Sequence, residues 1–373
     1  MSTPIDRRAF LKRASEVVGI GLVVPLLAAC GSAATPAASS AVAKPSEAAK
    51  PAASAASASA VAAGSAAAKG VTKVSYAYAS ANGYHLVSLI GAEKPDFTRK
   101  YGIEFDLVTT TNSPNAVNAL VGGSVNFASV TPDAAWAAQD KAPDVKQVAA
   151  IADGTPYVLI AQPEIKKAAE LKGKTFGASA VRGGADTTAI MVMMLENGVK
   201  PDEYTIVQAG AVSDRVVAMK AKTIQGIAQL EPQATQLRDE GFPEIDNANN
   251  YAPLKNVQSL VIISKKSWYE KNEDVAVNFF RAWTDITKWL YDPKNKDEVL
   301  AISKKTMSVG DKPAEGAYDL HVVKGKVASQ DLHVNEKAMQ QFIQNLKRAG
   351  IENLPADPMK FVDMSLVDKA LKA

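Results

Sequence analysis

The chain is poor in the residues that support redox and metal chemistry. Among its 373 residues Cys30 is the only cysteine, and His85, His321 and His333 are the only histidines. No disulfide can therefore form within the chain, and no paired-cysteine metal motif exists. Neither Gly-x-Ser-x-Gly nor His-Glu-x-x-His occurs in it. We expect no catalytic residue, no metal site and no cofactor.

One segment is similar to the end of a phosphate-binding loop. Residues 171–175 read LKGKT, but Ala168 stands where the first glycine of such a loop should be. A glycine is needed there because the backbone must turn tightly around the phosphates. The segment therefore predicts no nucleotide site.

The net charge of the chain is misleading. Residues 1–29 and residues 31–69 each carry a net charge of +2, which leaves about −1 for the remainder of a chain whose total is +3. A nearly neutral body has no extended basic surface for a phosphate backbone. We therefore expect no nucleic-acid partner.

The N-terminal segment has the three parts of an export signal. A basic head contains Arg7, Arg8, Lys12 and Arg13, residues 17–29 are almost wholly apolar, and small residues precede Cys30. The apolar part is shorter than the ~20 residues that a membrane-spanning helix needs. We expect a cleaved signal peptide over residues 1–29.

Two motifs in this leader resemble bacterial export signals. RRAFLK at 7–12 resembles the twin-arginine motif, although a general secretory leader can also carry two arginines. LAAC at 27–30 resembles a lipobox, in which the cysteine sulfur is acylated, with a palmitate-type chain for example, and becomes the new N-terminus. The resemblance implies an extracytoplasmic lipoprotein of the bacterial cell envelope, anchored through lipid on Cys30.

A linker is expected to follow the anchor. Residues 31–69 are nearly all Ala, Ser, Pro, Gly and Lys, with no aromatic residue. Such a composition buries too little apolar surface to offset the entropy of ordering. We expect residues 30–70 to comprise the lipidated cysteine and a disordered spacer.

The rest of the chain alternates strand and helix patterns, which is typical of α/β proteins. Because this part of the chain is too long for one average domain, we expect it to form two lobes. Predicted strands are 71–80, 103–110, 125–130, 145–152, 156–162, 174–179, 204–210, 223–230 and 257–264. Predicted helices are 115–123, 133–140, 186–198, 212–222, 274–292, 296–306 and 335–350.

Three segments of this part of the chain are similar to a known family. They are NALVGGSVNFASVTP (118–132), the segment 169–207 that begins AELKGK, and VVAMKAKTIQGIAQLEPQA (216–234). In this order they resemble the ABC-transporter solute-binding proteins that bind nitrate, sulfonates, taurine or pyrimidine precursors. Residues 225–228 depart from the family's usual Val-Asp-Ala type of sequence, but Pro232 keeps the expected proline. The resemblance implies a two-lobe periplasmic-binding-protein-like fold of type II.

That fold places a ligand cleft between two lobes joined by two crossing strands. The crossings are expected near 160–163 and 261–264. Lobe one would then comprise residues 71–161 plus 264–373, and lobe two residues 162–262.

Ligands of open α/β sheets bind beyond the carboxyl ends of the strands, where helices begin. The strand-to-helix junctions predict ligand contacts from Ser80, Asn82, Tyr84, His85, Asn112, Ser113, Ser129, Thr131, Thr155, Tyr157, Arg182, Gly183, Gly184, Asp186, Thr187, Ser213 and Glu231. The Ser, Thr, Asn and Asp residues could instead only cap the helices that follow them. Arg182 is the sharpest candidate, because a guanidinium suits carboxylate or sulfonate oxygens; the alternative is a solvated charge on a loop.

The resemblance implies a monomeric binding component of an importer, without enzymatic activity. It would capture a small organic anion, sulfonate- or carboxylate-like, and deliver it to a membrane permease with a cytoplasmic ATPase. A neutral pyrimidine or other heteroaromatic ligand stays open, as does a sensory role. Some relatives synthesise a pyrimidine and carry a cysteine-rich motif, which residues 70–373 lack.

Overall fold

The computed structural model describes residues 70–372. The export motifs, Cys30 and the linker lie outside the described residues. Within 70–372 none of the helices combines the length and the apolar character that crossing a membrane requires.

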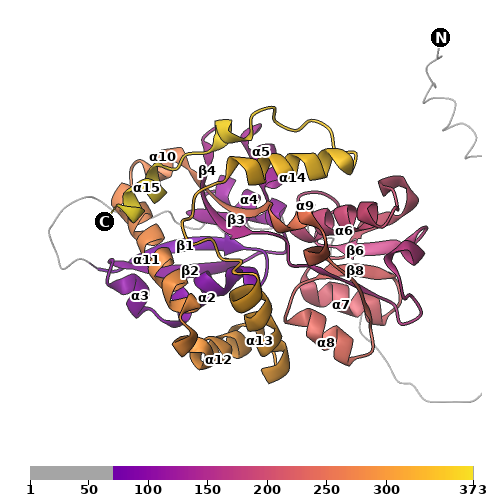
Figure 1. The fold of residues 1–373 in the computed structure, drawn as a ribbon. Helices are drawn as coiled ribbons and strands as arrows, with labels where there is room; N and C mark the ends of the chain where they lie inside the picture. The colour runs from indigo at the N-terminus through magenta and orange to yellow at the C-terminus, as the bar shows by residue number, and fades with distance from the viewer. Residues whose placement is uncertain (1–69, 373) are drawn as a thin grey trace, which may run out of the picture. The chain divides into compact units, whose positions relative to one another are not determined.

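The first sheet has five strands in the order β2-β1-β3-β10-β4; β1, β2, β3 and β4 are labelled in Figure 1. These strands are β1 (Thr72–Tyr78), β2 (Ile103–Thr109), β3 (Phe127–Val130), β4 (Val145–Asp153) and β10 (Gln258–Lys265). β1 pairs in parallel with β2 and β3, whereas β10 runs antiparallel to β3 and β4. Almost every residue of β3, β4 and β10 is buried, as expected for strands with helices on both faces.

The second sheet also has five strands, in the order β7-β6-β8-β5-β9. These strands are β5 (Val158–Ala161), β6 (Thr175–Ala178), β7 (Thr205–Gln208), β8 (Gly226–Gln229) and β9 (Glu244–Asn247). β6 is parallel to β7 and β8, and β5 is antiparallel to β8 and β9.

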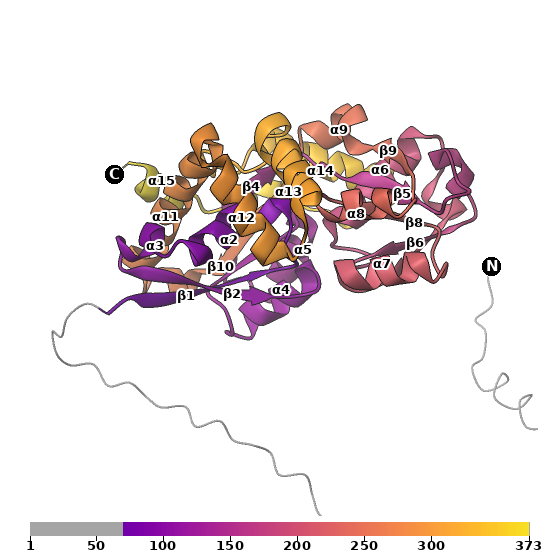
Figure 2. The same cartoon turned by 90° about the horizontal axis from the view of Figure 1, so that it is seen from below.

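Helices cover both sheets (Figures 1 and 2). They are α2 (Leu86–Glu93), α3 (Asp96–Arg99), α4 (Ser113–Val121), α5 (Pro132–Gln139), α6 (Ala185–Glu196), α7 (Val212–Lys220), α8 (Gln233–Asp239), α9 (Ala252–Lys255), α10 (Lys266–Tyr269), α11 (Glu273–Tyr291), α12 (Lys296–Met307), α13 (Asp311–Tyr318), α14 (Glu336–Arg348) and α15 (Ser365–Leu371). Short 3-10 turns include η1 (Gly83–His85) and η3 (Pro201–Glu203), and Asp319–Lys324 forms a π-helical segment, η6.

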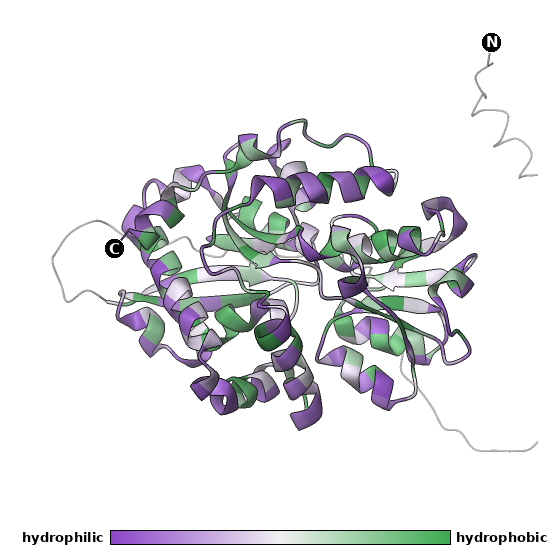
Figure 3. Cartoon of the chain, in the orientation of Figure 1, coloured by the Kyte–Doolittle hydropathy of each residue, from purple (hydrophilic) through white to green (hydrophobic). Residues whose placement is uncertain are grey.

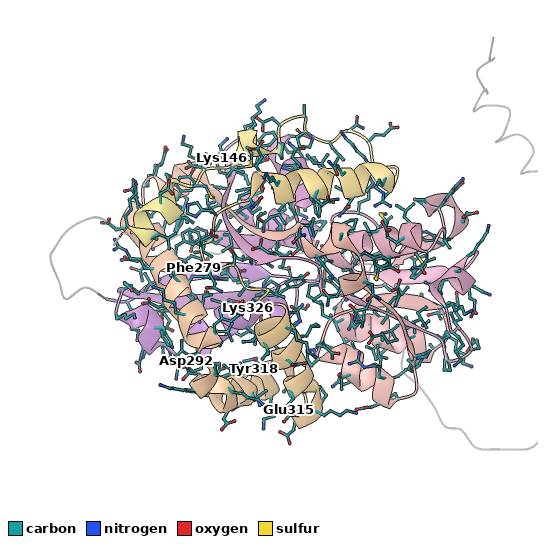
Figure 4. All side chains as sticks on the ribbon, viewed as in Figure 1. Lys146, Phe279, Asp292, Glu315, Tyr318 and Lys326 are labelled. Atoms are coloured by element: carbon teal, nitrogen blue, oxygen red, sulfur yellow. The ribbon has the colours of Figure 1, made fainter. Side chains whose placement is uncertain are left out.

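The core of the first sheet is built against α11. Phe279, Phe280 and Trp283 are at most 1% exposed. Phe279, labelled in Figure 4, stacks on Phe127 of β3 with ring centroids 4.4 Å apart. In Figure 3 the strands are mainly hydrophobic and the outer faces of the helices hydrophilic, the pattern expected of a layered α/β core.

The chain passes between the sheets at positions that differ from the predicted ones. β4 of the first sheet ends at Asp153 and β5 of the second begins at Val158; β9 ends at Asn247 and β10 begins at Gln258. The crossings are therefore 154–157 and 248–257, whereas the predicted crossings 160–163 and 261–264 fall on β5 and β10. An apolar run does not reveal which sheet it joins, and the break comes at Gly154, where φ is +77°.

The strand assignments define two lobes. The first lobe carries the first sheet, from residues 70–153 and 258–372, and the second lobe carries the second sheet, from 158–247. Helices from the C-terminal part of the first lobe contact the second. Arg348 at the end of α14 pairs with Glu196 of α6 at 2.7 Å, and Lys312 of α13 pairs with Asp239 of α8.

Candidate functional site

A small cavity lies between the two lobes, where the carboxyl ends of their parallel strands face one another. Its volume is about 50 Å³, enough for a few water-sized groups. The first lobe and its crossing segment line it with Ala79, Ser80, Asn82, Tyr84, His85, Thr111, Asn112, Ser113, Tyr157 and Leu260, and the second lobe with Ser179, Gly184, Ala185, Asp186, Val212, Arg215, Gln229, Leu230 and Gln233.

Two asparagines shape the first lobe's side of the cavity. Asn82 Oδ1 accepts the N–H of Tyr84 at 2.9 Å and caps η1. Asn112 Oδ1 accepts the N–H of Asn115 at 2.9 Å and caps α4, while its Nδ2 donates to the carbonyl of Ser179 at 3.1 Å. Asn112 thus both caps a helix and ties the two lobes together across the cavity.

A buried ion pair dominates the second lobe's side. Arg215 of α7 holds Asp186 of α6 through Nη1 and Oδ2 at 3.0 Å, and the two side chains are only 5% and 3% exposed. The carboxylate also accepts the N–H of Ser179 at 2.8 Å and its hydroxyl at 2.7 Å. Such bonding compensates much of the cost of burying two charges.

Gly184 makes this network possible. A Cβ at Gly184 would lie 2.7 Å from Asp186 Oδ1 and 2.8 Å from both Ser179 Oγ and Thr187 Oγ1. No side chain fits there without displacing the carboxylate. Gly184, predicted to contact a ligand, therefore makes room for the side chains of Ser179, Asp186 and Thr187.

Several polar atoms around the cavity have no hydrogen-bond partner in the protein. They are Arg215 Nε, Gln229 Nε2, Gln233 Oε1 and His85 Nδ1. Buried polar atoms are nearly always paired, because an unpaired one costs roughly 1–3 kcal/mol. Four such atoms around one cavity indicate a binding site for a polar ligand or for water.

Aromatic rings form the remaining wall. The rings of Tyr84 and Tyr157 are 6.1 Å apart at 54°. Burial, reinforced by the carboxylate of Asp186, raises the pKa of Tyr157 well above its usual value, so its phenol stays protonated. Burial lowers the pKa of His85 to about 3, with a smaller contribution from His321, and the imidazole is therefore neutral at neutral pH.

The structure brings many of the predicted contact residues to this cavity. Those that line it are Ser80, Asn82, Tyr84, His85, Asn112, Ser113, Tyr157, Gly184 and Asp186. Other predicted residues are engaged elsewhere. Thr131 precedes α5 and its N–H donates to Ser113 Oγ at 3.2 Å, the Thr155 N–H donates to the carbonyl of Leu254 at 2.8 Å, and Thr187 Oγ1 donates to the carbonyl of Ala180.

Three more of the predicted contact residues do not line the inter-lobe cavity. Glu231 accepts the N–H of Thr235 at 2.9 Å and pairs with Arg238. Ser129 is buried within β3. Ser213 lines a neighbouring hollow beside Val309.

Arg182 lies away from the inter-lobe cavity. It is exposed and lines, with Gly183, a separate hollow of about 800 Å³ beside α4, α5 and residues 351–355. The arginine inside the cavity is Arg215, which the sequence interpretation missed. The sequence could have indicated Arg215, because it lies in the first turns of α7, which follows the strand β7. The other contacts were predicted from junctions of this kind. Ser179 directly follows β6, Gln229 ends β8 and Gln233 begins α8, so all three lie at the strand-to-helix junctions from which contacts were predicted.

Within residues 70–372 no cluster of three or more His, Cys, Asp or Glu side chains is arranged to hold a metal ion.

Comparison with known proteins places this architecture in a family. A family model described as "NMT1/THI5 like" matches residues 82–296, more than half of the chain. The chain belongs to this family. The matched range includes every residue that lines the cavity from Asn82 onward, so the NMT1/THI5-like part of the protein contains nearly the whole site.

A sequence relative of this NMT1/THI5-like protein occurs in Brucella abortus (strain 2308), where it is provisionally named a binding protein. It is 29% identical over 195 residues, which are 52% of this chain and 57% of the relative. The match thus spans little more than half the length of that relative.

Solved structures share the fold of this NMT1/THI5-like protein. The nitrate-binding protein NrtA from Synechocystis PCC 6803 has a TM-score of 0.67 at 16% identity, covering 81% of this chain and 88% of its own. The alkanesulfonate-binding protein SsuA from Xanthomonas axonopodis pv. citri, bound to MOPS, has a TM-score of 0.62 at 13% identity, covering 82% and 99%. The predicted two-lobe periplasmic-binding-protein fold is confirmed.

Proposed function

We propose that this protein is the extracytoplasmic solute-binding component of an ABC importer and that it holds a small organic anion, sulfonate- or carboxylate-like, between its lobes. The observation that carries the proposal is the buried guanidinium of Arg215. It lines the inter-lobe cavity, and its Nε–H has no hydrogen-bond partner in the protein.

The guanidinium is only partly satisfied by the protein. Asp186 engages Nη1 at 3.0 Å, Nη2 has only a long 3.5 Å contact to Gln229 Oε1, and Nε has no partner. Nε and Nη2 form one edge of the guanidinium, and two parallel N–H donors along an edge match two oxygens of a carboxylate or sulfonate. A ligand of this kind would satisfy donors that are otherwise buried and unpaired.

Capture would proceed without covalent chemistry. A ligand contacting both lobes binds the closed form more tightly than the open form and shifts the population toward closure. Donors of the second lobe and polar groups of the first, such as Asn82 and Asn112, would surround it. The closed, loaded, monomeric protein would then deliver it to a permease with a cytoplasmic ATPase, while lipid on Cys30 keeps the protein at the membrane.

A neutral heteroaromatic ligand is the second candidate. Tyr84 and Tyr157 supply two aromatic rings beside the cavity, and Gln233 Oε1 and Gln229 Nε2 offer an unpaired acceptor and donor. A flat ring such as a pyrimidine could stack on such walls while it hydrogen-bonds to amides.

A thermal-shift screen of the purified chain against alkanesulfonates, small carboxylates, nitrate and pyrimidines tests the proposal. A ligand at 100 times its Kd stabilises the folded state by about 2.7 kcal/mol and raises the melting temperature. We expect stabilisation by a sulfonate or carboxylate. Stabilisation by pyrimidines alone would favour the second candidate, and no stabilisation by any class would count against solute binding.

Two arginine substitutions provide a matched comparison. Arg215→Gln removes the buried charge and is expected to weaken anion binding about 100-fold, roughly the loss of one charge-assisted pair. Arg182→Gln removes the same charge from the exposed loop and is expected to leave the affinity unchanged. Arg215→Gln combined with Asp186→Asn removes both partners, so that a binding loss is not confused with misfolding caused by an unpaired carboxylate. A loss with Arg182→Gln alone would restore Arg182 as the anion contact.

A further inference from the structure

We infer that Asp186 restricts the ligand to a single negative charge, so that this protein selects monoanions over dianions of the same shape. This inference rests on the proposed function and deepens it. The feature that carries it is a site with one buried cation whose charge is already shared with a fixed carboxylate.

The charges around the cavity balance before any ligand binds. Of the side chains that line it, Arg215 is the only arginine or lysine and Asp186 the only carboxylate. Their 3.0 Å contact forms the ion pair. A monoanion on the open Nε edge of the guanidinium would share that charge with Asp186. A second negative charge would find no second cation in the lining.

The starts of α6 and α7 do not supply the missing positive charge. The positive end of a helix dipole attracts anions only where its first N–H groups are free. Asp186 lies in the first turn of α6, and Asp214 Oδ2 in the first turn of α7 accepts the N–H of Ala211 at 2.9 Å. Each of these helices therefore already has a carboxylate in its first turn. That carboxylate offsets the positive end of the helix dipole, which is then not available to a dianion.

The Asp186 carboxylate is held in place. Ser179 donates its N–H and its hydroxyl to it, and Arg215 Nη1 pairs with it at 3.0 Å. The carboxylate therefore cannot turn away from an arriving anion. Repulsion at a separation of ~5 Å, with the reduced screening of a buried site, amounts to a factor on the order of 100 in affinity for an added charge.

The test uses two probes of the same shape and different charge. Methanesulfonate carries one negative charge, and methylphosphonate carries two at about pH 9. Calorimetric titration of the full chain is expected to give about 100-fold tighter binding for methanesulfonate. Between pH 6 and 9 methylphosphonate affinity is expected to fall as the probe loses its second proton, a measurement that needs no variant.

The Asp186→Asn variant separates this inference from simple size selection. Removing the carboxylate leaves the Arg215 charge unshared, and the preference is expected to drop to within about threefold or to reverse. Asp202→Asn is the matched control, because Asp202 is exposed on η3, ahead of the amino end of β7. This substitution removes one negative charge from the second lobe, and the variant is expected to keep the wild-type preference for methanesulfonate over methylphosphonate.

Three results would overturn the inference. They are equal affinity of the wild-type chain for both probes, an unchanged preference in a folded Asp186→Asn variant, and binding of neutral pyrimidines with no binding of either anion. The last result would leave solute binding intact. Solute binding itself would fail only if no compound of any class bound, so the two failures are distinguishable.

Discussion

His321 is a buried imidazole without a hydrogen-bond partner for either ring nitrogen. It lies on η6, 2% exposed, with its ring 5.8 Å from that of Tyr84. A Cβ at Gly83 would come within 2.0 Å of His321 Cδ2. The glycine of η1 is therefore what admits this ring behind the cavity wall.

The burial of His321 has a consequence for stability in acid. Burial lowers the pKa of His321 to about 3 from its usual 6.5. Below pH 6.5 the unfolded chain takes up a proton that the folded chain does not, so the free energy of unfolding falls as the pH falls. The contribution is about 1.4 kcal/mol per pH unit between pH 6.5 and 3.

We expect His321→Leu, an apolar side chain of similar volume, to flatten that decline. Urea unfolding at pH 7 and pH 5 measures it: the difference in unfolding free energy between the two pH values should be about 2 kcal/mol smaller than in the wild type. His85 has a similarly lowered pKa, mainly because of burial, and is present in both proteins. An unchanged difference would show that His321 is not buried as described.

For single residues, the sequence predicted which ones lie near the cavity better than it predicted what each side chain does there. Asn112 and Asp186 were predicted from the ends of strands, and both line the cavity. Arg182 and Arg215 follow neighbouring strands, and a sequence does not reveal which of the two points inward. Packing decides it: Arg215 is 4% exposed and pairs with Asp186, whereas Arg182 is exposed in the loop before α6.

Among the elements, the two crossing segments determine how the lobes are joined. The N–H of Gly154 donates to the carbonyl of Val257 and the N–H of Thr155 to that of Leu254, both at 2.8 Å. The hydroxyl of Tyr84 donates to the carbonyl of Gly154 at 3.2 Å. The first crossing is thus bonded both to the second crossing and to the cavity wall.

Gly154 is sensitive to substitution for two reasons. Its φ is +77°, and a Cβ there would lie 2.9 Å from the carbonyl oxygen of Lys255. Gly102 has a similar φ of +71° with nothing within 4 Å. We expect Gly102→Ala to lower the free energy of unfolding by about 1 kcal/mol and Gly154→Ala by about 2–4 kcal/mol. Urea unfolding of the two variants measures both values, and equal losses would contradict the described contact.

The periodicity of apolar residues predicted most of the strands and helices, but it did not predict which strands pair with one another. The predicted strand 103–110 and helix 274–292 correspond to β2 and α11 almost residue for residue. The strand β9 and several helices, among them α2, α8, α15 and the pair α13–η6, were not predicted. β9 is short and largely polar, reading EIDN, and α13 contains Pro313 and Gly316, so neither shows a clear period. Which sheet a strand joins depends on long-range pairing that no local pattern encodes.

For the whole molecule, the central claim is that a ligand is held between the lobes and enters when they separate. The Lys312–Asp239 pair joins α13 of the first lobe to α8 of the second. Both side chains are exposed, at 71% and 47%. Cysteines at these positions, in a Cys30→Ser background without other thiols, allow the closed form to be fixed with a short bis-maleimide. Lys304 and Asp311, paired at 2.7 Å within the first lobe, provide the matched control.

The most direct measurement is calorimetric titration of a ligand from the thermal-shift screen into the two cross-linked proteins. We expect the protein cross-linked between 239 and 312 without ligand to bind none on the timescale of the titration. The protein cross-linked after loading should retain its ligand through dialysis, and the 304–311 control should bind like the wild type. Normal binding by the protein whose lobes are fixed together would contradict the account.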